Sequence, residues 1–167
     1  MEFEEAKYKF INTWGSLGSL WGINKAMAQI QALLFISPKP LSTEEIMAEL
    51  KISRGNTSMN VRQLIDWGIV TKELVAGERR EYFSTEKDVQ ELTRIIANER
   101  SRREIKPVIK ALQEVSTIKD DGTLATKELI KQTKALKDLT ETADSILTKV
   151  LGEKQNWLTK SIIKIFK

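Results

Sequence analysis

Two helices with clear start signals follow each other between residues 42 and 68, and their order constrains the fold more than any other feature of the chain. Ser42 is followed three positions later by Glu45, which is the pattern of a capping box at a helix N-terminus. Ser53 is a second N-cap residue, and Gly68 is typical of the position just after a helix. The sequence therefore predicts two consecutive helices joined by a turn of a few residues.

A hairpin and a preceding apolar helix complete this unit. Residues 70–75 and 81–83 are rich in β-forming residues and flank a turn at residues 76–78. Residues 23–36 predict a strongly apolar helix, which must end at the following Ser-Pro-Lys-Pro segment because proline disfavours helix at the residue before it. This order of elements predicts a winged helix-turn-helix domain over residues 23–85.

The flanking segments also have helical patterns. Residues 3–14 predict a short helix, and the Gly-rich stretch that follows predicts a loop, so we expect residues 1–22 to form an N-terminal helix and a loop. Residues 86–116 have a long helical pattern, in which Pro107 predicts a kink or the start of a new helix.

A heptad pattern marks the last long helix. Apolar residues recur every seven positions, with others in the companion positions: Leu129, Leu136, Ala143, Val150, Leu139 and Ile146. Such a helix needs a partner, which can be a second copy of the chain, a helix around residues 108–115, or both. The basic amphipathic tail, residues 154–167, either completes a dimer core, contacts a membrane surface or is partly ordered. We therefore expect a mainly α fold with long C-terminal dimerisation helices over residues 86–167.

The composition argues against an enzyme. The chain has no cysteine and no histidine, which excludes disulfides, Cys/His zinc sites and histidine acid–base catalysis. We find no calcium-loop, phosphate-loop or dinucleotide-binding motif and expect neither a metal nor a cofactor. The chain opens on acidic, amphipathic residues and has no apolar run of about 20 residues, so we expect a cytoplasmic protein without a membrane segment.

Polar and basic side chains concentrate on the second of the two helices, residues 54–67. Placed on a helix, Thr57, Val61, Leu64 and Ile65 form an inward stripe. We expect the other side to contact DNA bases, because Asn and Gln bind adenine and Arg binds guanine in the major groove. Its residues are Asn56, Asn60 and Gln63, flanked by Arg54 and Arg62.

Phosphate contacts are expected at the start of this helix and in the hairpin. Hydroxyl and N–H groups at a helix N-terminus favour a phosphate, which points to Ser53, Thr57 and Ser58. Arg79 and Arg80 can lie along the minor groove or the DNA backbone, although an ordinary solvated hairpin would look the same. The net charge of +4 is modest, so DNA binding must rest on this local clustering.

Four motifs carry a resemblance to a known family: "LSTEEIMAEL", "SRGNTSMNVRQLIDWGIV", "GERREYF" and "RSRREIKPVI", in chain order. They resemble the GbsR-like branch of the MarR-family winged-helix transcriptional regulators. The resemblance covers about residues 10–115. Membership of the wider family implies a cytoplasmic homodimer that binds palindromic double-stranded DNA. The GbsR-like branch resembles repressors of osmoprotectant genes, so the resemblance also implies a repressor of such genes. Some members respond to choline, so the resemblance also implies a small effector such as choline or glycine betaine.

Three tryptophans, Trp14, Trp21 and Trp67, are the residues we consider for an effector site, because aromatic faces bind quaternary ammonium ions. The alternative is that they pack in the core. A second function class also stays open, in which the winged helix binds another protein and does not bind DNA.

Overall fold

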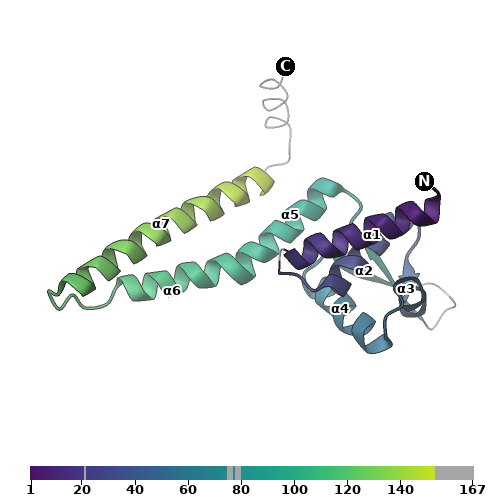
Figure 1. The fold of residues 1–167 in the computed structure, drawn as a ribbon, viewed down its shortest axis with the longest axis horizontal. Helices are drawn as coiled ribbons and strands as arrows, with labels where there is room; N and C mark the ends of the chain where they lie inside the picture. Colours follow the sequence, from purple (N-terminus) through teal and green to yellow (C-terminus); the bar gives the residue numbers. More distant parts are fainter. Residues whose placement is uncertain (21, 75–76, 78–79, 153–167) are drawn as a thin grey trace, which may run out of the picture. The chain divides into compact units, whose positions relative to one another are not determined.

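The computed structural model describes residues 1–20, 22–74, 77 and 80–152 (Figure 1). The fold is mainly helical with a small three-stranded antiparallel sheet and a long C-terminal helix, which confirms the predicted fold class. The chain divides into two compact units after Leu92. None of the helices in the described ranges combines the length and the apolar character needed to cross a membrane.

The first unit follows the predicted order of elements. Its strands pair in the order β1-β3-β2, so β3 lies between the other two and aligns Phe83 with both Leu41 and Lys72. The two-residue strand β1 is an element that the sequence pattern does not predict. The elements are α1 (Phe3–Leu20), α2 (Lys25–Ile36), β1 (Leu41–Ser42), α3 (Thr43–Leu50), α4 (Arg54–Asp66), β2 (Val70–Leu74) and β3 (Glu81–Thr85).

The glycine-rich segment near the N-terminus is helical, so the predicted loop is wrong. Helix α1 continues through it to Leu20 and packs along α2 (Figure 1). A Cβ atom on Gly15 would lie 2.6 Å from Cγ of Gln29, and one on Gly18 would lie 2.5 Å from Cβ of Ala28. These glycines therefore let two helices approach closely and do not break the first of them.

The predicted helix ends are confirmed. The Ser42 hydroxyl accepts a hydrogen bond from the main-chain N–H of Glu45, whose carboxylate accepts one in return from the N–H of Ser42. The Ser53 hydroxyl accepts a hydrogen bond from the N–H of Asn56. Gly68 has a φ of 72°, the left-handed conformation that ends α4 and turns the chain into β2.

The core of the first unit is centred on α2. The largest of its fully buried apolar side chains come from three helices: Ile30, Leu33, Leu34, Ile46 and Leu64. The ammonium group of Lys87 donates hydrogen bonds to the carbonyl oxygens of Leu34, Phe35 and Ser37, at 2.6, 2.8 and 2.7 Å. A cation at this position satisfies carbonyl groups that the end of α2 leaves unpaired.

The second unit is a helical hairpin. Its elements are α5 (Val89–Arg100), a π-helical turn η1 (Ser101–Ile105), α6 (Lys106–Ser116) and α7 (Leu124–Gly152). Pro107 lies in the first turn of α6, which confirms that a new helix starts near it. Helix α7 packs against α6 and η1, and the Ser101 hydroxyl donates a hydrogen bond to the carboxylate of Asp144 on α7.

The heptad residues of α7 are not the ones that pack against α6 in this hairpin. Leu129, Leu136, Leu139 and Ile146 are 44, 51, 66 and 58% exposed. The half-buried positions of α7, such as Ile130 and Leu147, lie on a different side of the helix. The pairing of α6 with α7 therefore leaves an apolar stripe of α7 uncovered. The side chain of Val150 and the basic tail lie outside the described residues.

Candidate nucleic-acid interface

Helix α4 is held on its inner side by α2 and α3. Thr57, Val61 and Leu64 are at most 3% exposed, so most of the predicted inward stripe is confirmed. Ile65 is 36% exposed and does not belong to it. In the described part of the chain, the opposite side of α4 is exposed at Gly55, Met59, Arg62, Gln63 and Asp66.

Asn60 faces the core, and the prediction that it faces outward is wrong. Its side chain has no exposed surface, because position 60 lies between Thr57 and Leu64 at helical spacings of three and four residues. The Asn60 amide donates hydrogen bonds to the main-chain oxygen of Asn56 at 2.8 Å and to its side-chain oxygen at 2.6 Å. Asn60 therefore presents no group to a DNA base.

Thr57 is also fully buried, which contradicts its predicted contact with a phosphate. Its hydroxyl donates to the main-chain oxygen of Ser53 at 3.1 Å. Ser58 and Asn56, by contrast, are half-buried, and Ser53 is exposed at the N-terminus of α4. The start of the helix thus keeps some of the predicted hydrogen-bonding groups and loses one.

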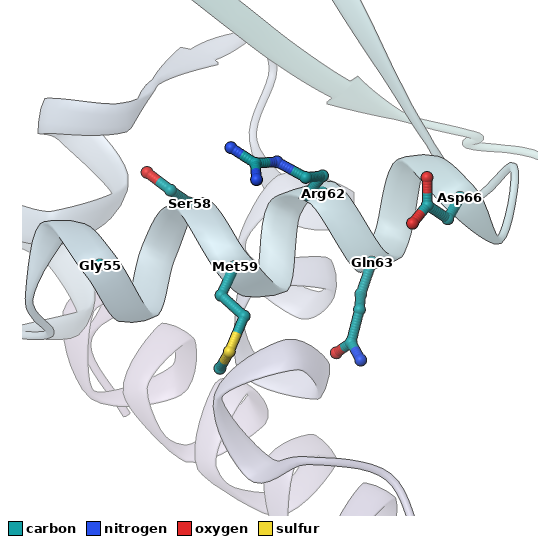
Figure 2. A pocket seen from close by; sticks show the side chains of 6 residues that line it. All are labelled: Gly55, Ser58, Met59, Arg62, Gln63 and Asp66. Carbon is teal, nitrogen blue, oxygen red and sulfur yellow. The ribbon is translucent and has the colours of Figure 1, made fainter.

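The outer side of α4 forms an open hollow of about 400 Å³ (Figure 2). Arg62 and Gln63 are exposed there, as predicted, and point to opposite sides of the helix ridge. Met59, 54% exposed, and Asp66 share this face and are not among the contact residues predicted from the sequence. Helical spacing alone would have found them. The lining residues are Gly55, Ser58, Met59, Arg62, Gln63 and Asp66.

Gly55 has no structural role that the described residues reveal. It is exposed, does not have a positive φ, and a Cβ atom placed on it would have no neighbour within 4 Å. Gly55 is the second residue of α4, in its first turn, where glycine costs less than in the middle of a helix. Within the described ranges, neither the backbone conformation nor a close contact requires a glycine at this position.

The charges around α4 fall into two groups. Arg54 forms an ion pair with Glu44, with 2.6 Å between the guanidinium nitrogen and the carboxylate oxygen. The pKa of Glu44 is lowered, first by a hydrogen bond from its own main-chain N–H, then by the bond from Arg54, with a smaller effect of Arg80. Within the described residues, Arg62 makes no ion pair, so its guanidinium is available to a ligand.

The hairpin between β2 and β3 carries the predicted wing. Gly77 has a φ of 84°, a conformation that glycine adopts without strain. Arg80 is exposed just before β3, whereas Arg79 lies outside the described residues. Lys72 and Glu81 form an ion pair across the two strands. The wing thus offers at least one exposed guanidinium on the side of Glu44.

Trp14 and Trp67 belong to different elements. Trp14 is half-buried on α1 and stacks on Phe10, with ring centroids 6.0 Å apart and an interplanar angle of 23°. Trp67 is the C-cap residue of α4, and Trp21 lies outside the described residues. No group of three acidic side chains in the described part of the chain is arranged to hold a metal ion.

Comparison with known proteins connects this interface to a family. A MarR family model matches residues 21–81, which contain the helix-turn-helix and most of the hairpin. The chain is 30% identical to the HTH-type transcriptional regulator MmpR5 of Mycobacterium tuberculosis (strain ATCC 25618 / H37Rv) over 124 residues, which are 72% of this chain and 68% of that protein.

A solved structure agrees at the level of the fold. The crystal structure of a transcriptional regulator superposes with a TM-score of 0.67 and 19% identity, and the match covers 88% of this chain and 96% of that one. One assignment follows from the exposed face of helix α4, the hairpin beside it and these similarities. The chain belongs to the MarR family of winged-helix transcriptional regulators and is a DNA-binding regulator, not an enzyme.

Proposed function

We propose that this protein binds double-stranded DNA with sequence specificity by placing the outer face of α4 in the major groove. The supporting observation is that Arg62 and Gln63 are both exposed and line the same open hollow, while the inner side of α4 is held in the core. Arg can donate two hydrogen bonds to guanine, and Gln can bind adenine through two hydrogen bonds. We therefore assign the contacts with base edges to Arg62 and Gln63.

Phosphate contacts are assigned to the groups around this face. The Ser53 and Ser58 hydroxyls and Asn56 lie near the start of α4, where N–H groups favour a phosphate. Arg80, together with Arg79, extends these contacts along the wing. Arg54 adds a phosphate contact once its ion pair with Glu44 opens.

The active form is proposed to be a homodimer. The support is the stripe of Leu129, Leu136, Leu139 and Ile146 on α7, which the hairpin with α6 leaves exposed. A second copy that covers this stripe would remove its apolar surface from water. A two-fold dimer places two α4 helices in successive major grooves, about 34–36 Å apart, so the DNA site is a palindrome.

The resemblance to the GbsR-like branch supports a repressor that works in the cytoplasm and responds to a small osmoprotectant such as choline or glycine betaine. Trp14, Trp21 and Trp67 remain the residues proposed for effector binding. Titration of either compound, followed by tryptophan fluorescence and DNA binding against a matched salt control, tests this part. No response at tens of millimolar would leave the tryptophans as packing residues.

Selection of bound sequences from random duplexes tests the main proposal. We expect an inverted repeat, and we expect the binding constant for the selected site to fall steeply with salt, because each neutralised phosphate releases counterions. Equal retention of all duplexes at every salt concentration would contradict sequence-specific binding. It would favour the alternative, in which the same surface binds a protein.

A further inference from the structure

Two neighbouring residues on the outer face of α4 are not explained by packing. Among the described residues, no atom outside the adjacent helix backbone lies within 4 Å of the place where a Cβ would stand on Gly55, and Met59 is 54% exposed. They are four residues apart on one helix, so they lie one above the other on the same face (Figure 2).

The glycines of α1 show by contrast what is unusual about Gly55. Side chains of α2 lie 2.6 and 2.5 Å from the places where Cβ atoms would stand on Gly15 and Gly18. At Gly55 nothing from the described residues approaches, although glycine disfavours the helix. A glycine placed at an open helix surface fits a position where a bound molecule must come close to the backbone.

Met59 gives the chemistry of that molecule. It is the large apolar side chain on a face otherwise lined by Ser58, Arg62, Gln63 and Asp66. Its unbranched thioether adapts to irregular surfaces. Among the base edges of the major groove, the 5-methyl group of thymine is the apolar one, and protein side chains recognise it by apolar contact.

We propose that Gly55 and Met59 together form a seat for the 5-methyl group of one thymine in each half-site. Gly55 leaves room for the base pair to approach the helix backbone, and the Met59 side chain covers the methyl group. This inference rests on the proposed function, in which α4 enters the major groove. It adds a base preference that neither Arg62 nor Gln63 supplies.

The test replaces each thymine of the selected site, one at a time, with deoxyuridine, which lacks only the methyl group. For the wild type we expect one position per half-site where this change weakens binding about fourfold, the effect of withdrawing one methyl-sized group from an apolar contact. Met59→Ala should bind the thymine and deoxyuridine duplexes equally at that position. Asp66→Ala, on the same face and without an assigned DNA contact, should keep the wild-type ratio.

Gly55→Ala gives an independent result. The added methyl group occupies the seat, so binding to the thymine duplex should weaken by at least about tenfold, as for loss of a specific base contact. Deoxyuridine at the same position should restore part of the affinity. The melting temperature should not fall, because an added Cβ atom meets no neighbour in the described residues, and this separates lost binding from lost folding.

Two outcomes would overturn the inference while leaving the proposed function intact. One is sequence-specific binding in which no thymine can be distinguished from deoxyuridine. The other is a Gly55→Ala variant that binds the thymine duplex as tightly as the wild type. Failure of the wild type to bind any duplex would instead contradict the proposed function, and this inference with it.

Discussion

The side-chain amide of Asn60 donates hydrogen bonds to both the main-chain and the side-chain oxygen of Asn56, one turn earlier on α4. Both residues look like base-reading groups in the sequence. In the fold, Asn60 is fully buried and the Asn56 side chain accepts its hydrogen. Asn60 therefore supports α4 from its buried side, and the proposed base contacts fall to residues on the outer face.

Replacement of Asn60 by alanine should therefore lower stability and leave specificity unchanged. We expect Asn60→Ala to reduce the free energy of unfolding by about 1 kcal/mol, the usual contribution of an intramolecular hydrogen bond. The preference among duplexes that differ by one base pair should stay as in the wild type. Urea unfolding and a panel of single-base variants measure the two effects. A relaxed preference at one base pair would restore Asn60 to the interface.

Replacement of Gln63 should have the opposite profile. Because its side chain is exposed, Gln63→Ala should unfold at the wild-type urea concentration. Binding to the selected site should weaken by about 1–3 kcal/mol, with the preference lost at one base pair per half-site. An equal loss of affinity for every duplex would show that Gln63 contacts a phosphate and not a base.

Removal of the Glu44 charge should strengthen DNA binding. In the free protein, Glu44 pairs with Arg54 and also attracts Arg80, so it competes with phosphates for both. We expect Glu44→Gln to bind all duplexes more tightly and to steepen the log–log salt dependence by about one unit. Glu5→Gln, an exposed carboxylate on α1, is the control. Identical salt slopes for both variants would place Arg54 and Arg80 away from the DNA.

Charges on the exposed stripe of α7 should dissociate the dimer. Leu136→Lys combined with Leu139→Lys would place unpaired ammonium groups in the proposed interface, which is costly. We expect monomers in sedimentation and a sharp loss of operator affinity, although α4 is unchanged. Ser145→Lys, at an exposed polar position of the same helix, should remain dimeric. A double variant that sediments as a dimer would locate the interface elsewhere.

The sequence predicts the elements whose signals are local. Three such signals depend only on residues a few positions apart: the Ser42–Glu45 capping box, the Ser53 cap and the αL conformation of Gly68. The heptad pattern likewise points to a stripe that α6 does not cover. In these cases the physical cause lies within the segment that carries the pattern.

The sequence-based predictions are wrong where an element distant in the sequence determines the environment of a residue. Gly15 and Gly18 have the appearance of a loop because nothing near them in sequence reveals Gln29 and Ala28. Asn60 looks like an outward residue because it is polar. Its helical position beside Thr57 and Leu64 nevertheless places it in the core. Met59 was missed for the reverse reason, since an apolar residue is expected inside. Helical position, and not polarity, therefore identifies the outer face of α4, and the packing of the helix agrees with it.

Directed cleavage of DNA from α4 tests the central claim most directly. The chain has no cysteine, so Asp66→Cys carries a single iron chelate on the outer face without removing a proposed base contact. On the selected duplex we predict hydroxyl-radical cleavage in two clusters, one per half-site, about 10–10.5 base pairs apart. The same chelate on Lys9→Cys of α1 should give only background. Cleavage from Asp66→Cys that is no stronger or more localised than from Lys9→Cys would contradict the placement of α4 in the major groove.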